Sequence, residues 1–150
     1  MLVTAHSSVW RRRRASRVAS VANREMGYDF GIFSTLEPPD ERDIHLYLYG
    51  RESRFVGLAV LERRTEINRC SWSSPEPGEP VATAPPGLWT VGFVWTLKVH
   101  RQSGIAKRLL ATAMSDLGVT TERMAWYPPL SDDGMLLVRK LCPEGFLIGH

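Results

Sequence analysis

The sequence predicts an α/β domain in which a mixed sheet is flanked by helices. Helical and strand-like segments alternate along the 150 residues, in the order helix, hairpin, strand, helix, strand, helix, strand. The clearest pair is an apolar run over residues 88–99, which leads through a glycine turn into an amphipathic stretch ending at Gly118. A chain of this length can bury one substantial core, so we expect residues 1–150 to form a single domain.

The first half of the chain is predicted to form a helix and a hairpin. Over residues 8–26, small and apolar residues recur at three- and four-residue spacing, which is typical of a helix, and Gly27 stands where a C-terminal cap belongs. Residues 43–50 alternate between apolar and polar, and residues 54–62 follow a short polar turn, so the two stretches predict a hairpin. Residues 1–8 are expected to be a flexible tail.

The second half begins with a change of composition. Residues 65–87 include "SSPEPGEPVATAPPG" and are expected to form one long loop, because Pro, Gly and Ser disfavour regular elements. Four elements are then predicted after the strand over residues 88–99. They are a helix ending before Gly118, a strand "ERMAWY", a short helix "SDDGMLLVRKLC" capped by Ser131, and a last strand "GFLIG".

Charge and cysteine content restrict the class of protein. The net charge is +3, and the sharpest cluster is Arg11–Arg14, which either contacts nucleic acid or an acidic partner, or is the solvated face of the first helix. Cys70 and Cys142 lack metal-site spacing, so no metal is expected, and two cysteines favour a reducing intracellular compartment, cytoplasmic by default. No run of about 18 apolar residues occurs, so we expect no membrane span.

The turn between the apolar strand and the amphipathic helix has the chemistry of a phosphate site. It reads Arg101-Gln102-Ser103-Gly104-Ile105-Ala106. The first backbone N–H groups of a helix have no partners inside it, and the helix dipole adds positive charge at the same end. Gly104 permits close approach of a ligand, and Arg101 and Lys107 add cationic side chains. The turn matches neither the phosphate loop of nucleotide triphosphatases nor the dinucleotide-binding glycine motif.

The pattern Arg-x-x-Gly-x-Ala resembles the pyrophosphate-binding motif of the GNAT acetyltransferases, and the order of elements around it fits the GNAT fold. The resemblance implies that acetyl-CoA is the cofactor. Backbone groups of residues 96–99 would meet the pantetheine arm, and the N–H of Leu97 would meet the thioester oxygen. The residues implied to bind the cofactor are Leu97, Lys98, Val99, Arg101, Gln102, Ser103, Gly104, Ile105, Ala106 and Lys107.

Four longer stretches narrow the resemblance to the acetyltransferase domain of the sister-chromatid cohesion (ESCO) acetyltransferases. They are "VANREMGYDF", "RFVGLAVLE", "VWTLKVHRQSGIAKRLLATAMSDLG" and "DDGMLLVRKLCPEGFLIGH", and Trp95 matches the tryptophan of the family's central strand. The similarity covers roughly residues 15–150. It implies acetyl transfer to a lysine amine of a protein partner, and a nuclear location for a true cohesion enzyme.

The chain departs from this family where protons are handled. The family's serine and aspartate positions are Gly92 and Pro129 here, and the family's zinc finger is missing. An amine must be neutral to attack a thioester, so other groups have to take its proton. The candidates are Asp132, Asp133 and Glu62 as general base, with Tyr127 as the acid for the leaving thiolate.

Each of these candidates also has a purely structural interpretation. Acids are favoured in the first turn of a helix, a glutamate that ends a strand is commonly solvated, and Tyr127 could pack beside Trp126.

Two alternative functions therefore stay open at this point. One is a small-molecule amine acetyltransferase on the same fold. The other is a non-catalytic module that keeps the fold and holds a partner through Arg11–Arg14.

Overall fold

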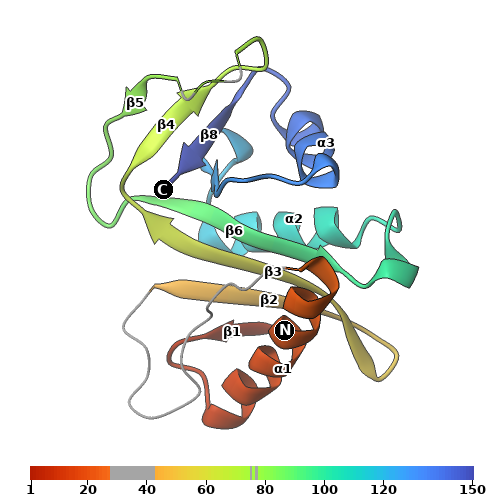
Figure 1. The fold of residues 1–150 in the computed structure, drawn as a ribbon. Coiled ribbons are helices and arrows are strands. Elements are labelled where there is room, and N and C mark those ends of the chain that lie inside the picture. Colours follow the sequence, from red (N-terminus) through yellow and green to blue (C-terminus); the bar gives the residue numbers. More distant parts are fainter. Residues whose placement is uncertain (28–42, 75, 77) are drawn as a thin grey trace. The chain divides into compact units, whose positions relative to one another are not determined.

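The computed structural model describes residues 1–27, 43–74, 76 and 78–150, so parts of the stretches 21–30 and 65–87 discussed above lie outside the described residues (Figure 1). The strands follow one another in the order β1 (Leu2–Thr4), β2 (Ile44–Arg51), β3 (Arg54–Arg64), β6 (Leu88–Thr96), β7 (Ala125–Trp126), β8 (Phe146–Gly149), β4 (Ile67–Cys70) and β5 (Pro80–Val81). The chain divides into two compact units, which are described in turn: unit 1 comprises residues 1–60 and 93–113, and unit 2 comprises residues 61–92 and 114–150. In the described part of the chain no helix has both the length and the apolar character needed to cross a membrane.

Unit 1 is built from one long helix and the strands against which it packs. Its elements are β1 (Leu2–Thr4), α1 (Val9–Met26), β2 (Ile44–Arg51), most of β3 (Arg54–Arg64), the end of β6 (Leu88–Thr96), the 3-10 turn η1 (Lys98–His100) and most of α2 (Ile105–Leu117). The predicted C-terminal cap of α1 is confirmed, and the structure adds an N-terminal cap at Ser8. The hydroxyl of Ser8 accepts a hydrogen bond from the N–H of Arg11, and Gly27 ends α1 at a φ of 65°.

The core of unit 1 depends on small residues in α1. Ala15, Ala19 and Ala22 are at most 2% exposed and pack with Leu46, Leu58 and other apolar strand residues. Because alanine side chains are short, the helix backbone can lie close to the sheet. Trp95 belongs to the same cluster, which ties α1 to the strand that leads into the glycine turn.

The expectation of a flexible tail over residues 1–8 is wrong for its first part. Leu2–Thr4 forms β1, which pairs antiparallel with β2 in the register Leu2↔Tyr47 and Val3↔Leu46. Val3 is fully buried in the unit 1 core. A strand of three residues is too short to show a periodicity. Its pairing partner lies more than forty residues away, so the local sequence does not indicate the pairing either.

Unit 2 contains the other strands and two short helices. Its remaining elements are β4 (Ile67–Cys70), β5 (Pro80–Val81), η2 (Thr121–Arg123), β7 (Ala125–Trp126), α3 (Asp132–Leu141) and β8 (Phe146–Gly149). The start of β6 pairs parallel with β7, and β7 pairs parallel with β8. The hydroxyl of Ser131 caps α3 by accepting the N–H of Gly134, as predicted.

The prediction of a single loop over residues 65–87 is also wrong. β4 and β5 lie inside this stretch and pair antiparallel with each other. β4 also pairs antiparallel with β8, in the register Ile67↔Gly149 and Cys70↔Phe146. The segment is Pro- and Gly-rich as a whole, but Ile67 has a partner at the other end of the sequence, which no local composition can reveal.

Candidate functional site

The glycine turn of unit 1 exposes a run of backbone donors, as a phosphate site requires. α2 begins at Ile105, and the N–H of Arg108 makes the first helical bond, 3.0 Å from the carbonyl oxygen of Gly104. Among the described residues, the N–H groups of residues 102–107 donate no hydrogen bond to a backbone carbonyl. These groups stand at the positive end of a helix dipole and are available to an anion.

The backbone of the turn leaves space in front of these donors. Gly104 has a φ of 79°, and a Cβ placed on it would meet no atom within 4 Å. Gln102 has a φ of 61°, which is uncommon for a residue with a side chain. The turn is therefore strongly curved, and it is open on the side where a side chain would otherwise project.

Glu25, in the last turn of α1, holds the strand that leads into this turn. Its carboxylate accepts a hydrogen bond from Nε1 of Trp95 at 2.5 Å and another from the N–H of Lys98 at 3.1 Å. Nη2 of Arg101 lies 3.9 Å from the same carboxylate. Sequence reasoning did not identify Glu25, because no pattern in α1 shows that its last turn will meet residues some seventy positions later.

The side chain of Arg101 is turned back onto the protein. Its Nε donates to the carbonyl oxygen of Thr96 at 3.2 Å, and its Nη2 lies 3.7 Å from Sδ of Met26. The arginine of the predicted motif thus braces the turn from behind in this structure. The exposed side chain of Lys107 is the other cation that the sequence placed at the turn.

The structure corrects the role expected for Leu97. Its N–H donates to the carbonyl oxygen of Val56 at 2.9 Å, so it is already bonded to β3 and is not free for a thioester oxygen. The predicted strand also ends earlier than expected. β6 stops at Thr96, and Lys98 and Val99 belong to η1, where the Val99 side chain is 80% exposed.

Close packing of α2 against β3 fixes the position of the turn. A Cβ added to Gly57 would lie 2.6 Å from Cγ2 of Ile105 and 3.1 Å from Cδ1 of Leu109, so only glycine fits there. Arg108 adds a hydrogen bond from Nη1 to the Tyr49 hydroxyl at 3.1 Å. Ile105, predicted as a cofactor residue, is 3% exposed and is therefore a packing residue whose backbone alone faces the turn.

Unit 2 brings two of the predicted acid–base candidates together through an arginine. Arg64 forms an ion pair with the carboxylate of Glu62, and its guanidinium lies 5.0 Å from the centre of the Tyr127 ring. The Glu62 side chain is 22% exposed, and the residue Tyr127 is 38% exposed. Sequence reasoning missed Arg64, although its alternation with Glu62 at the end of a strand places both on one face.

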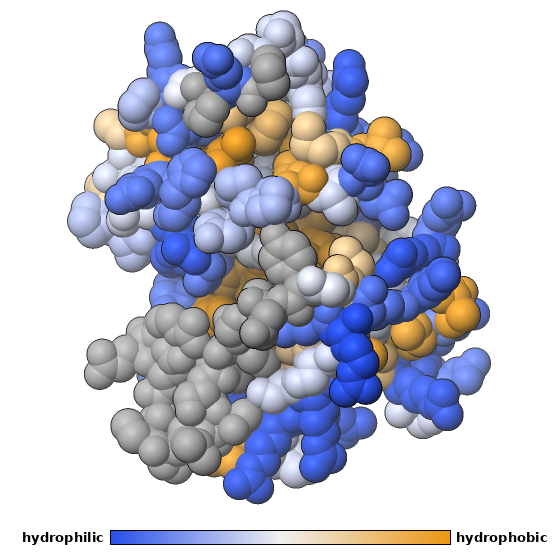
Figure 2. All heavy atoms as spheres, viewed as in Figure 1, coloured by the Kyte–Doolittle hydropathy of each residue, from blue (hydrophilic) through white to orange (hydrophobic). Residues whose placement is uncertain are grey.

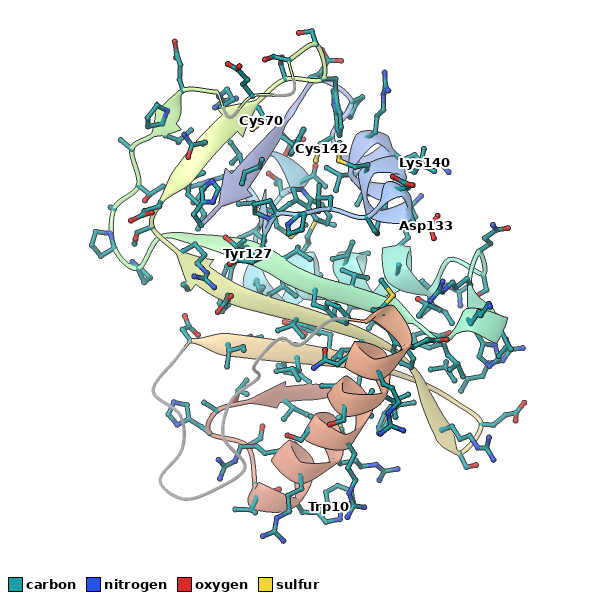
Figure 3. All side chains as sticks on the ribbon, viewed as in Figure 1. Trp10, Cys70, Tyr127, Asp133, Lys140 and Cys142 are labelled. Atoms are coloured by element: carbon teal, nitrogen blue, oxygen red, sulfur yellow. The ribbon has the colours of Figure 1, made fainter. Side chains whose placement is uncertain are left out.

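The other two candidates stand apart from this group. Asp132 and Asp133 are exposed residues in the first turn of α3, and Figure 3 shows Asp133 at the start of that helix. Among the described residues, no ion pair or hydrogen bond involves either side chain, so the dipole of α3 is the electrostatic partner that the structure gives them.

A separate cavity of about 560 Å³ lies within unit 2, lined by β4, η2 and the start of β8. Its walls include Cys70, Cys142 and the acidic residues Glu76, Glu79 and Glu122. Burial raises the pKa of the Cys142 thiol, so the thiol stays protonated near neutral pH. Hydrogen bonds lower the pKa of the Glu122 carboxyl, and the bond with the Thr120 side chain has the largest effect.

Comparison with known proteins places these units in a recognised fold. No protein-family model matches the sequence, and no curated protein does either. The xEco2 acetyltransferase domain bound to a K105-CoA conjugate is similar in structure, with a TM-score of 0.74 and 21% identity over 100% of this chain and 91% of that one.

The xEco2 acetyltransferase domain alone gives a TM-score of 0.72 and 21% identity, over 99% of this chain and 88% of that one. At this identity the likeness concerns the fold. The predicted GNAT fold is therefore confirmed, and the chain is similar in fold to the xEco2 acetyltransferase domain.

Proposed function

We propose that this chain is an acetyl-CoA-dependent N-acetyltransferase of the GNAT type, and that its acceptor is a lysine amine of a protein partner. The observation that carries the proposal is the run of free N–H groups over residues 102–107, at the start of α2 and in front of Gly104. It occurs in a chain whose whole length follows the fold of an acetyltransferase domain.

The cofactor would be held mainly by backbone. The pyrophosphate of acetyl-CoA would accept hydrogen bonds from residues 102–107, with Lys107 adding charge. The pantetheine arm would follow Thr96–Val99. Glu25 would act as a positioning residue, since it fixes both the end of β6 and the N–H of Lys98 without facing the phosphates.

The transfer itself is a direct attack of the amine on the thioester. A neutral amine adds to the carbonyl carbon, a tetrahedral intermediate forms, and the C–S bond breaks to give an amide and CoA thiolate. The amine loses one proton and the thiolate gains one. We assign the first to Glu62 and the second to Tyr127, because Arg64 contacts both side chains and orients them. Asp132 or Asp133 is the alternative base.

The protein-lysine acceptor is taken from the fold neighbour, whose structure holds a K105-CoA conjugate. A small amine remains the competing acceptor. The non-catalytic alternative is favoured by one specific observation, the replacement of the family's serine and aspartate by Gly92 and Pro129. The two alternatives differ from the proposal, and from each other, in which acceptors become acetylated after acetyl-CoA has bound.

Calorimetric titration with acetyl-CoA tests the cofactor half, with two valine variants compared. Gly104→Val fills the open side of the turn. Gly118→Val is its matched control, because Gly118 flanks the same helix, has a φ of 63° and also has no atom within 4 Å of its Cβ position. Loss of one or two hydrogen bonds to a charged group, about 1.5–3 kcal/mol each, predicts at least about tenfold weaker binding for Gly104→Val alone. Equal effects of the two variants would contradict the site.

Intact-mass spectrometry after incubation with acetyl-CoA tests the transfer. The protein alone, a lysine-rich protein and a polyamine serve as acceptors in separate reactions. Acetylation of the protein acceptors supports the proposal, whereas acetylation of the polyamine alone supports the small-molecule alternative. Normal acetyl-CoA binding with no transfer to any acceptor would favour the non-catalytic module.

A further inference from the structure

Helix α1 carries a concentration of arginine that the cofactor turn does not use. It contains six arginines and no lysine, and its one acid, Glu25, lies in the last turn. Arg12 is 1% exposed and donates from Nε to the carbonyl oxygen of Ser7 at 3.1 Å, so it is part of the fold. The other five, Arg11, Arg13, Arg14, Arg17 and Arg24, are exposed.

Trp10 stands at the start of this array with most of its ring in solvent. It is 62% exposed, the largest value among the exposed aromatic side chains of the described residues. The guanidinium of Arg14 lies 5.2 Å from the Trp10 ring centre and 4.9 Å from that of Phe55. We call Trp10 and the five exposed arginines the basic face of α1. Figure 3 shows Trp10 at the N-terminal end of the helix.

The spacing of these residues makes a continuous stripe. Trp10, Arg14, Arg17 and Arg24 follow one another at intervals of four, three and seven, so they share one side of the helix. At a rise of 1.5 Å per residue the stripe is about 21 Å long. Hydrophilic side chains, coloured blue, gather over this part of unit 1 in Figure 2.

These charges are not neutralised by any residue that the structure describes. Within the described ranges, none of the five exposed arginines forms a salt bridge with a carboxylate, and pairs such as Arg13 and Arg17 repel each other across one turn. Like charges at this spacing cost helix stability, so the array is better explained by a polyanionic partner than by solvation alone.

The chemistry of the face favours one class of polyanion. A membrane-bound helix needs a free apolar side, but the apolar side of α1 is buried through Ala15, Ala19 and Ala22. Arginine binds phosphate in a planar, bidentate geometry, and an exposed tryptophan provides a surface on which a base can stack. An acidic peptide would use the charges but not the ring.

We propose that the basic face of α1 binds single-stranded nucleic acid, with the exposed arginines on the phosphates and Trp10 stacked on a base. The proposal is independent of acetyl transfer, because none of these residues belongs to the turn or to the acid–base candidates. RNA and DNA share the phosphates and bases concerned, so the test includes both.

Fluorescence anisotropy measures the binding directly. The probes are fluorescein-labelled oligo(U) and oligo(dT) of about 20 nucleotides, long enough to cover the stripe, and a DNA duplex of equal length. For Arg14→Gln/Arg17→Gln/Arg24→Gln, the three arginines of the stripe, the slope of log affinity against log salt should fall by about 2, since each phosphate contact contributes about 0.7. Trp10→Ala should weaken binding about tenfold at every salt concentration with its slope unchanged.

A charge-matched control removes three cations elsewhere. Arg123→Gln/Arg139→Gln/Lys140→Gln lies in unit 2 on exposed residues and should leave both affinity and slope nearly unchanged. Circular dichroism melting verifies that each variant folds. Absence of binding at low salt would overturn the proposal. Displacement of the oligonucleotide by poly-glutamate at equal charge, together with no effect of Trp10→Ala, would replace it with an acidic protein partner. Tighter binding of the duplex would also contradict it.

Discussion

The two compact units differ in charge and in how each assembles its functional groups. Unit 1 contains thirteen Lys and Arg against seven Asp and Glu, whereas unit 2 contains six against nine. The donors of unit 1 are backbone N–H groups of consecutive residues. The candidates of unit 2 are side chains from β3, from α3 and from the residue that follows β7. A site made of backbone groups tolerates substitutions as long as the turn keeps its shape. A site made of side chains loses a functional group whenever one of those residues is replaced.

This difference matches the chemistry proposed for each unit. A pyrophosphate carries negative charge and is suited to a basic unit with free N–H groups. A lysine acceptor arrives as a cation and is suited to an acidic unit. The departures from the family pattern are divided between the units in the same way. Gly92 and Pro129 both fall in unit 2, whereas the turn that resembles the family motif lies in unit 1.

The largest expected effect concerns the acid–base pair. Glu62→Gln should lower the turnover number about 100-fold, because general base catalysis is worth at least about that factor, while acetyl-CoA affinity stays the same. Tyr127→Phe should act in the same direction. Asp132→Asn/Asp133→Asn is the matched control and should retain activity. Steady-state kinetics measures all three variants, with the acceptor that the mass-spectrometry experiment identifies. A larger loss of turnover in Asp132→Asn/Asp133→Asn than in Glu62→Gln would move the base to α3.

The next largest effect is expected where α2 packs against β3 in unit 1. Gly57→Ala should destabilise the protein by about 1–3 kcal/mol, because overpacking forces Ile105 and Leu109 to move. The displaced helix should also bind acetyl-CoA more weakly. Gly50→Ala is the control, since its Cβ would meet Phe55 at an ordinary 3.7 Å. Urea unfolding and calorimetry give both quantities. Equal stability of the two variants would show that α2 is not fixed by this contact.

A smaller effect is expected at Glu25. Glutamine has one acceptor oxygen where the carboxylate has two, so in Glu25→Gln either Trp95 or Lys98 loses its acceptor. We expect a loss of about 1–2 kcal/mol in unfolding free energy and up to about tenfold weaker acetyl-CoA binding. Glu66→Gln replaces an exposed glutamate of unit 2 and should change neither. An unchanged affinity in Glu25→Gln would mean that the turn holds its shape without this brace.

Local signals allowed most of unit 1 to be predicted and less of unit 2. The alanine spacing of α1, its C-terminal cap and the position of Gly104 could all be predicted, because each depends on neighbours within one turn. β4 was missed because its partner β8 lies far along the chain. The bond from Leu97 to Val56 and the ion pair of Arg64 with Glu62 likewise depend on which strands lie side by side, and a sequence pattern contains no distances.

The smallest expected effect is a pH dependence of stability that comes from Cys142 in unit 2. Burial raises the pKa of its thiol. Above an ordinary cysteine pKa of about 8.5, the unfolded chain therefore releases this proton while the folded chain keeps it, so the folded state loses stability as pH rises. Urea unfolding at about pH 7.5 and about pH 9.5, on either side of that value, should show a larger loss for the natural chain than for Cys142→Ala. Equal losses would mean that the Cys142 thiol ionises as easily in the folded protein as in the unfolded one, and that the lining of the unit 2 cavity is wetter than its burial indicates.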